Sequence, residues 1–357
     1  MSLPSERPAR FAARVIAWQR DHGRHDLPWQ VHDPYRVWLS EVMLQQTQVA
    51  TVLAYFDRFT ARFPDVQALA AASVDDVLAL WSGLGYYSRA RNLHRAAQAI
   101  VNEHGGKFPR TSAALATLPG IGRSTAAAIA AFSFGERVAI LDGNVKRVLA
   151  RVLAFDGDLA QAGAERELWR AATGLLPSRG IETYTQGLMD LGATICLARR
   201  PSCLLCPVQT LCRAAMSGTQ DRYPVKSRRL LRGRRDNAWL ELRHCDRIWL
   251  VRREAKGIWA GLWSLPEFDS VAALDAAGAA WPGKGVALPS FIHVLTHLDW
   301  TLRPVRWNLP SRTPARVLTE LESRWPSGRW FDLADALRLG LPAPLRKQLS
   351  ADRRLNP

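Results

Sequence analysis

Residues 1–221 carry the apolar periodicity of α-helices almost throughout. Alanine-rich amphipathic stretches recur, and glycine or proline separates them at residues 104–106, 118–120, 156–157 and 176–177. Apolar residues spaced three and four apart indicate helices with one buried face, and glycine and proline mark their ends. We therefore predict an all-α domain.

After Asp236 the pattern changes to one typical of strands. Residues 238–242 (AWLEL) and 247–254 (RIWLVRRE) alternate apolar and polar side chains around a turn at residues 244–246, which predicts a β-hairpin. Residues 272–280 indicate a helix, and residues 291–309 indicate a further pair of strands. The last third of the chain is thus predicted to be a small α+β domain.

A basic segment lies between the two patterns. Residues 222–235 (RYPVKSRRLLRGRR) include seven arginines or lysines and no acidic residue, which is typical of a solvated linker that can also touch phosphate. We predict a helical domain over residues 1–221, a basic linker over residues 222–236 and an α+β domain over residues 237–350.

Residues 33–59 are predicted to form one long helix, whose apolar face includes Trp38, Val42 and Val49. Glu41 lies on that face. Burial disfavours a charged carboxylate and raises its pKa, which is the condition for a general acid near neutral pH. The alternative is a structural glutamate bonded to a buried partner.

Residues 115–131 (LATLPGIGRSTAAAIAA) predict a helix end, a tight turn and a new helix. Gly120 and Gly122 allow unusual backbone dihedrals and a close approach to a partner, and the N–H groups that begin the second helix can hold a phosphate oxygen. The pattern indicates a helix–hairpin–helix that binds the DNA backbone without reading sequence. An ordinary pair of antiparallel helices is the alternative.

Asp142 directly precedes an amphipathic helix within residues 138–155, and we predict that it caps this helix. Backbone N–H groups and the helix dipole favour the ionised form of a capping carboxylate. Beyond its structural role, an anion at this place can stabilise a developing cation.

Four of the five cysteines fall close together, at Cys196, Cys203, Cys206 and Cys212, with six, two and five residues between them. Thiolates bunched in this way can reach a single centre. One Cys-x-x-Cys pair with wider gaps on both sides favours a loop around a [4Fe–4S] cluster over a zinc site. Zinc, disulfides and buried free cysteines are the alternatives.

The composition of the chain indicates which class of partner it binds and in which compartment it works. A net charge of +16 and a pI near 10.5 indicate a polyanion as partner, with nucleic acid ahead of anionic membrane. No run of eighteen residues lacks charge, and the N-terminus has no signal-peptide pattern. With thiolate ligands that need a reducing compartment, we expect a cytoplasmic, nucleoid-associated protein that does not enter the membrane.

These motifs together resemble the adenine DNA glycosylases of the MutY family, within the wider endonuclease III-like helix–hairpin–helix superfamily. The matching segments occur in order over the whole helical part: SEVMLQQTQV, GLGYYSRARNL, FP followed by LPGIGRSTA, ILDGNVKRVLAR, MDLGATIC and the run from Cys196 to Cys212. The resemblance implies an all-α helix–hairpin–helix glycosylase core with an iron–sulfur cluster loop, followed by an α+β Nudix-like domain.

For the chemistry, the resemblance implies two carboxyl groups acting on an adenine that has been flipped out of the DNA stack. Glu41 would protonate a ring nitrogen, and Asp142 would stabilise the cation that forms at the sugar. Asn144 would hold the sugar or the catalytic water, and Glu182 would contact the exocyclic amine of adenine.

For binding, the resemblance implies double-stranded DNA with adenine opposite 8-oxoguanine or guanine, bound by a monomer. Gln46 and Tyr86 would probe the oxidised base, with Tyr86 and Tyr87 as plain core aromatics in the alternative reading. The DNA backbone would lie against Gly120, Gly122 and Lys146. The four cysteines would hold a structural [4Fe–4S] cluster.

Ser124 separates this chain from strand-nicking relatives, which carry a Schiff-base lysine at the same place after the hairpin. Serine cannot form a Schiff base, so we expect a monofunctional glycosylase with Ser124 beside the substrate. The alternatives are an endonuclease III-like bifunctional pyrimidine glycosylase and lyase, and a cluster-bearing DNA-binding module without catalysis.

The C-terminal part resembles the Nudix-like recognition domain of the same family, most clearly at residues 257–268 (GIWAGLWSLPEF). A Nudix hydrolase needs a cluster of glutamates for magnesium, whereas residues 262–290 hold only Glu267, Asp269 and Asp275 as acidic residues. We therefore expect no pyrophosphatase activity. Thr296 and His297 take the place of the loop that contacts the oxidised base in the family.

Overall fold

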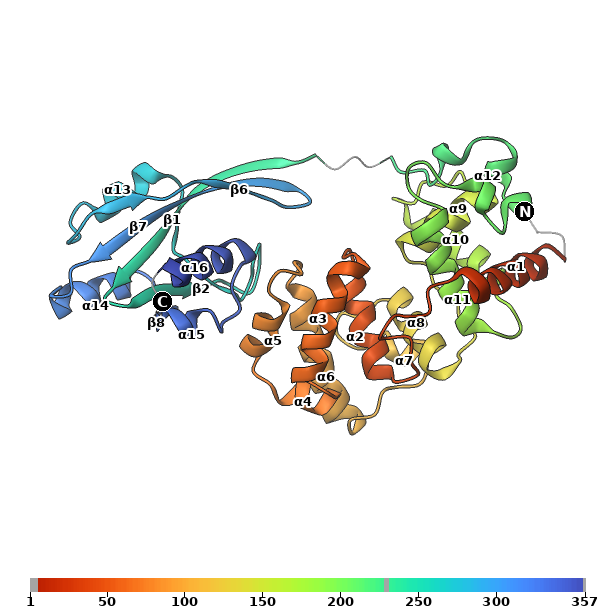
Figure 1. Cartoon of the computed structure of the whole chain (residues 1–357), viewed down its shortest axis with the longest axis horizontal. Coiled ribbons are helices and arrows are strands. Elements are labelled where there is room, and N and C mark those ends of the chain that lie inside the picture. The colour runs from red at the N-terminus through yellow and green to blue at the C-terminus, as the bar shows by residue number, and fades with distance from the viewer. Residues whose placement is uncertain (1–5, 228–230, 356–357) are drawn as a thin grey trace. The chain divides into compact units, whose positions relative to one another are not determined.

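The computed structural model describes residues 6–227 and 231–355 (Figure 1). Residues 228–230 of the expected linker lie outside the described residues. The chain divides into two compact units, of which the first combines Met1–Ala70 with Arg95–Arg229 and the second combines Ala71–His94 with Leu230–Pro357. The second unit thus contains a short stretch of the helical part as well as the C-terminal part.

The first two-thirds of the described chain are helical, as predicted. The α-helices are α1 (Glu6–His22), α2 (Pro34–Leu44), α3 (Val49–Arg62), α4 (Val66–Ala71), α5 (Val74–Trp81), α6 (Ser88–His104), α7 (Ser112–Leu115), α8 (Arg123–Phe134), α9 (Gly143–Leu153), α10 (Ala162–Gly174), α11 (Ile181–Asp190) and α12 (Arg213–Met216). A π-helical turn at Leu191–Ile195 and 3₁₀ turns at Cys203–Leu205, Gln209–Leu211 and Gln220–Arg222 shape the segment that carries the cysteines.

The prediction of one long helix over residues 33–59 is wrong. The chain leaves the helix after Leu44 and re-enters it at Val49, so that α2 and α3 are separate helices. Between them Gln46 has a φ of 58°, in the left-handed region that interrupts a right-handed helix. Apolar periodicity continues across the break because both helices bury one face, and the pattern alone therefore hides it.

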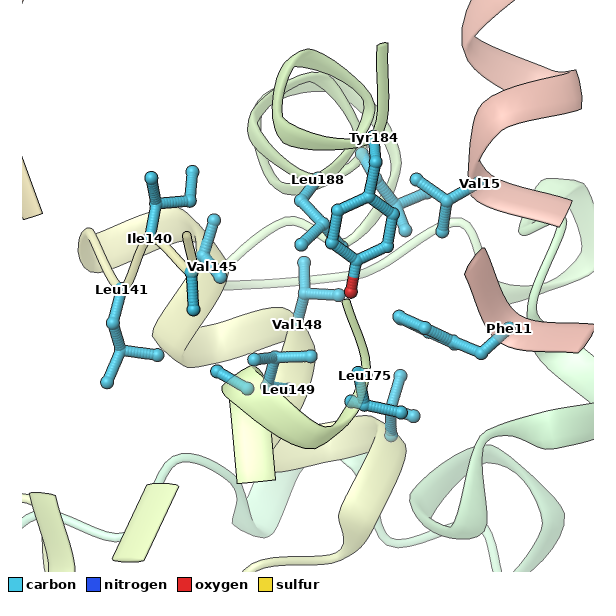
Figure 2. Packing of buried hydrophobic residues seen from close by; sticks show 14 of the residues in the cluster. Phe11, Val15, Ile140, Leu141, Val145, Val148, Leu149, Leu175, Tyr184 and Leu188 are labelled. Atoms are coloured by element: carbon cyan, nitrogen blue, oxygen red, sulfur yellow. The ribbon is translucent and has the colours of Figure 1, made fainter. Parts of the chain in front are cut away.

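The core of the first unit forms where α1, α9 and α11 meet. Phe11 and Val15 of α1 pack with Val145 and Val148 of α9 and with Tyr184 of α11 (Figure 2). Each of these side chains is almost fully buried, and burying one stabilises the fold by about 1.5–3 kcal/mol. This packing holds in place α9, which carries Asn144 and Lys146, and α11, which carries Glu182.

The C-terminal part of the second unit is built on one mixed sheet, as the α+β pattern predicts. Its described elements are β1 (Gly233–His244), β2 (Arg247–Arg252), β3 (Trp263–Ser264), β4 (Glu267–Phe268), α13 (Val271–Gly278), β5 (Gly285–Ala287), β6 (Phe291–Val294), β7 (Leu298–Leu309), α14 (Ala315–Ser323), β8 (Gly328–Asp332), α15 (Leu333–Ala336) and α16 (Ala343–Leu355).

Two long strands, β1 and β7, run side by side in parallel through the middle of this sheet (Figure 1). The main order is β3-β2-β1-β7-β5; β4 also pairs with β1, β6 with β7, and β8 with β2. The predicted hairpin is the antiparallel pair β1 and β2, and the predicted second strand pair is β6 and β7. The turn between β6 and β7 carries Thr296 and His297.

None of the helices within residues 6–227 and 231–355 is long and apolar enough to cross a membrane.

Candidate active site and nucleic-acid interface

A cavity of about 280 Å³ opens in the first unit between α2, the loop before it, the end of α8 and the start of α11. Glu41 of α2 and Glu182 of α11 both line it, together with Trp29, Phe132 and Gln186. A pocket with apolar walls and a few polar groups is the usual form of a site for a small planar ligand. Two of the predicted site residues therefore meet in one cavity.

Burial raises the pKa of Glu41 from 4.5 to about 8, and the negative charge of Asp142 adds to the rise. The prediction from the apolar face of α2 is confirmed. A carboxyl group with this pKa keeps its proton near neutral pH and can donate it.

Asp142 is the N-cap of α9, as predicted, and its Oδ1 accepts a hydrogen bond from the Val145 N–H at 2.7 Å. The expectation that the backbone N–H groups and the helix dipole lower the pKa of this carboxyl group is wrong. Burial raises the pKa of Asp142 more than backbone N–H groups and the nearby Arg147 and Lys146 lower it. Asp142 is partly buried, and the free-energy cost of removing its anion from water exceeds the stabilisation that its hydrogen-bond donors and the nearby cations provide.

The other residues predicted around Asp142 lie on the first turns of α8 and α9. The Ser124 hydroxyl accepts a hydrogen bond from the Leu141 N–H at 3.0 Å, directly before Asp142. Asn144 Oδ1 accepts one from Arg147 Nη2 at 2.9 Å. Lys146 Nζ pairs with Glu165 Oε1 at 2.5 Å, so the predicted phosphate contact of this lysine has an intramolecular competitor.

The predicted hairpin joins α7 to α8. Gly120 has a φ of 75°, which suits glycine. Gly122, in contrast, caps α8 with an ordinary φ of −80°, so the expectation of an unusual dihedral at this residue is wrong. A Cβ added at Gly122 would meet no atom within 4 Å. Both glycines are exposed, and a phosphate group can approach this backbone.

Gln46 is exposed in the break between α2 and α3, and the neighbouring Gln45 donates from Nε2 to Thr125 Oγ1 of α8 at 3.3 Å. The break therefore lies against the helix that begins at the hairpin.

In the second unit, Tyr86 and Thr296 form a hydrogen bond between their hydroxyl groups. Both line a cavity of about 580 Å³ whose walls also include Trp259, His293 and His297. Tyr86 is 44% exposed and has a φ of 46°. Residues that are 210 positions apart in sequence and were singled out separately thus meet in one cavity.

The four clustered cysteines line a single pocket between α9 and the turns that follow α11. Burial raises the pKa of Cys206 to about 12, and the neighbouring cysteines add to the rise. Arg151 Nη1 donates to Cys196 Sγ at 3.3 Å. Within the described ranges, no three His, Cys, Asp or Glu side chains are grouped as a ready metal site. Four thiols around one pocket remain a donor set of the type that holds iron–sulfur clusters.

Sequence reasoning missed three residues of the cavity around Glu41. Arg24 and Gln186 line it, and the fully buried Asp190 binds both of them. A signal was present in the sequence, because Glu182, Gln186 and Asp190 follow one another at four-residue intervals and so share one face of α11.

Comparisons with known proteins cover both parts of the chain. Residues 39–173 match the model of the HhH-GPD superfamily of base excision DNA repair proteins, and residues 238–351 match the NUDIX domain. The adenine DNA glycosylase of Buchnera aphidicola subsp. Acyrthosiphon pisum is 34% identical over 347 residues, which cover 95% of this chain and 96% of that protein. The Homo sapiens adenine DNA glycosylase is 34% identical over 391 residues, which cover 90% of this chain and 70% of that protein.

Solved structures show a similar helical fold. A thermostable thymine-DNA glycosylase superposes with a TM-score of 0.53 at 27% identity and covers 59% of this chain and 98% of its own. A non-covalent complex of endonuclease III with DNA gives a TM-score of 0.50 at 22% identity, covering 61% of this chain and 100% of its own. At that identity the second likeness concerns the fold alone.

Proposed function

The chain belongs to the family of adenine DNA glycosylases, and from this premise we propose that it acts on adenine opposite 8-oxoguanine or guanine in double-stranded DNA. It is a DNA N-glycosylase, a hydrolase of base excision repair. The observation that carries the proposed chemistry is the half-buried Glu41, whose pKa is raised to about 8 in a cavity of about 280 Å³.

The reaction begins with an adenine that leaves the base stack and enters the cavity around Glu41. An enzyme cannot reach the glycosidic bond of a stacked base, so extrusion is required. The protonated Glu41 donates to a ring nitrogen of adenine, which makes the base a better leaving group. Glu182, on the wall of the same cavity, accepts a hydrogen bond from the exocyclic amine.

Asp142 then stabilises the positive charge that develops on the sugar as the glycosidic bond breaks. Its charge influences Glu41, so the two carboxyl groups act on one substrate. Glu41 works as the acid and Asp142 as the anion, the division of roles found in glycosidases. Asn144, two residues further along at the start of α9, holds the sugar or the water that completes hydrolysis.

The product strand stays intact because no amine is placed to form a Schiff base at position 124. The Ser124 hydroxyl instead accepts from the Leu141 N–H. This supports monofunctional hydrolysis over the endonuclease III-like lyase reaction.

DNA binds through its backbone at the hairpin, where Gly120 and Gly122 are exposed, and at Lys146 of α9. We further propose that Cys196, Cys203, Cys206 and Cys212 hold a [4Fe–4S] cluster, since all four line one pocket. Such a cluster supplies structural order to the loop around it and takes no part in hydrolysis. The buried Arg151, which donates to the Leu197 carbonyl at 2.6 Å, ties this loop to α9.

The oxidised base is recognised by Tyr86, Thr296 and His297, whose cavity contains several planar and hydrogen-bonding side chains. Gln46 probes the same base pair from the break between α2 and α3. In this scheme residues 1–221 are the glycosylase domain, residues 222–236 a basic linker whose last residues begin strand β1 (Gly233–His244), and residues 237–350 the recognition domain. We expect a monomer that works on DNA in the cytoplasm, at the nucleoid.

A glycosylase assay tests the proposal directly. Duplexes with adenine opposite 8-oxoguanine, guanine or thymine are incubated under single-turnover conditions, with and without alkali before the strands are separated. We expect cleavage only after alkali, fast opposite 8-oxoguanine and guanine and slow opposite thymine. Equal rates for the three partner bases would contradict the proposed substrate.

A further inference from the structure

Asp190, at the end of α11, hydrogen-bonds to two residues that line the cavity around Glu41, Arg24 and Gln186. Its side chain is fully buried, and its Oδ1 accepts from Arg24 Nε at 2.7 Å. Its Oδ2 accepts from the Arg24 backbone N–H at 3.0 Å. The Arg24 carbonyl in turn accepts from Gln30 Nε2 at 2.7 Å, and Gln30 Oε1 accepts from the Leu27 N–H at 3.1 Å. One carboxylate thus fixes the segment that carries several cavity residues.

The same carboxylate fixes the orientation of an amide. Gln186 Nε2 donates to Asp190 Oδ1 at 2.8 Å. A carboxylate paired with a guanidinium accepts hydrogen bonds and has no proton to donate. The Gln186 amide can therefore face Asp190 only with its nitrogen, and its carbonyl oxygen is left for the cavity that Gln186 lines. No donor within the described ranges hydrogen-bonds to that oxygen.

We infer that Asp190 is a positioning residue for base selection, which it exerts by holding the Gln186 carbonyl as an acceptor toward the target base. This inference rests on the proposed function. The exocyclic amine of adenine has two N–H bonds, so it can donate to Gln186 as well as to Glu182. Guanine presents an acceptor oxygen at the same ring position, and two acceptors that face each other repel.

Asp190→Asn provides the test. An asparagine can donate, so Gln186 is free to turn over and present its NH₂ group to the base. Single-turnover excision is measured for adenine and for purine, which lacks the exocyclic amine, each opposite 8-oxoguanine. A general destabilisation of the protein would lower both excision rates by the same factor, so the ratio of the two rates is not affected by it. We expect this ratio to fall about three- to tenfold, the value of one neutral hydrogen bond.

Two further variants make the result specific. Gln186→Met removes the carbonyl and should lower the same ratio, and adding Asp190→Asn to it should change the ratio no further. Asp21→Asn, an exposed carboxylate on α1, is the matched control and should leave the ratio unchanged. An unchanged ratio in a folded Asp190→Asn protein, or a further fall in the double variant, would overturn the inference.

A measurement on the unaltered protein covers the case in which Asp190→Asn does not fold. The side-chain amide signal of Gln186 in a nitrogen-15 spectrum, assigned by its loss in Gln186→Met, should show one amide proton protected from exchange with water. Rapid exchange of both protons would reject the bond to Asp190. Failure of the wild-type protein to excise adenine at all would instead reject the proposed function.

Discussion

Burial raises the pKa of Glu41 to about 8, and the charge of the nearby Asp142 contributes to that rise. In the proposed mechanism the two carboxyl groups differ in role although they share one environment. If Glu41 is the acid, the single-turnover rate should fall about tenfold per unit above about pH 8. It should also fall at acidic pH, where Asp142 takes up a proton and no longer stabilises the cation. A rate that rises through this range would show that the ionised form of Glu41 is the active one.

Glu41→Gln should lower the single-turnover rate by about 10²–10⁴-fold, because an amide keeps the shape of the side chain and cannot protonate adenine. DNA affinity should stay nearly unchanged, since binding uses other groups. Asp142→Asn should give a similar loss of rate with α9 intact, because asparagine is also a good N-cap. Near wild-type rates for either variant would remove that carboxylate from the mechanism.

Glu41→Gln should also stabilise the protein at alkaline pH. The folded-state pKa of Glu41 is raised, so its ionisation opposes folding, and the free energy of unfolding falls as pH rises from about 4.5 to about 8. The variant lacks this penalty and should be more stable than the wild type by roughly 2–4 kcal/mol at about pH 9. Urea unfolding at about pH 5.5 and 9 measures the difference, which should shrink at the lower pH.

Ser124→Lys should introduce some covalent trapping by borohydride, since it places an amine beside the sugar. It should also slow adenine release, because the Leu141 N–H next to Asp142 loses its acceptor. Ser124→Ala separates the two effects, as it removes the acceptor and adds no amine. Trapping of the wild type as efficient as that of a true lyase would contradict the monofunctional assignment.

The purified protein should be brown and contain about four iron atoms per chain. Cys203→Ser should lower iron content and DNA affinity together, because the proposed cluster would order a loop that Arg151 ties to α9. Cys245→Ser, which changes the exposed fifth cysteine, is the matched control and should alter neither. Stoichiometric zinc without iron in anaerobically prepared protein would reject the cluster.

Thr296→Ala and Tyr86→Phe should each reduce the preference for 8-oxoguanine over guanine by up to about tenfold, since each breaks the same hydrogen bond. The double variant should lose no more than the larger single effect. Additive losses would show that the two hydroxyl groups act on the base independently.

Local rules predicted much of the site. The cap at Asp142 and the raised pKa of Glu41 follow from residue type and helical period, and both agree with the structure. The direction of the Asp142 pKa did not follow, because it depends on how much of the molecule surrounds the cap. The sequence likewise did not predict that Tyr86 contacts Thr296, since contacts between distant segments depend on the fold.

The break after Leu44 was missed for a related reason. No glycine or proline marks it, and the residue that takes the left-handed conformation is Gln46, a type that rarely does so. The four-residue spacing of Glu182, Gln186 and Asp190 is visible in the sequence, but a buried aspartate looks like an exposed one in sequence.

Gln46 and Tyr86 both rest in left-handed backbone conformations, with φ values of 58° and 46°, which cost non-glycine residues about 1 kcal/mol or more. A protein that searches for a rare lesion meets a vast excess of normal base pairs. If each encounter required these turns to refold first, that delay would be repeated at every pair. If Gln46 and Tyr86 probe the base pair as proposed, their exposed side chains are in place before DNA arrives, and inspection should be limited by diffusion along the duplex. Glycine at either position should then lengthen the search while leaving the chemistry of base removal intact.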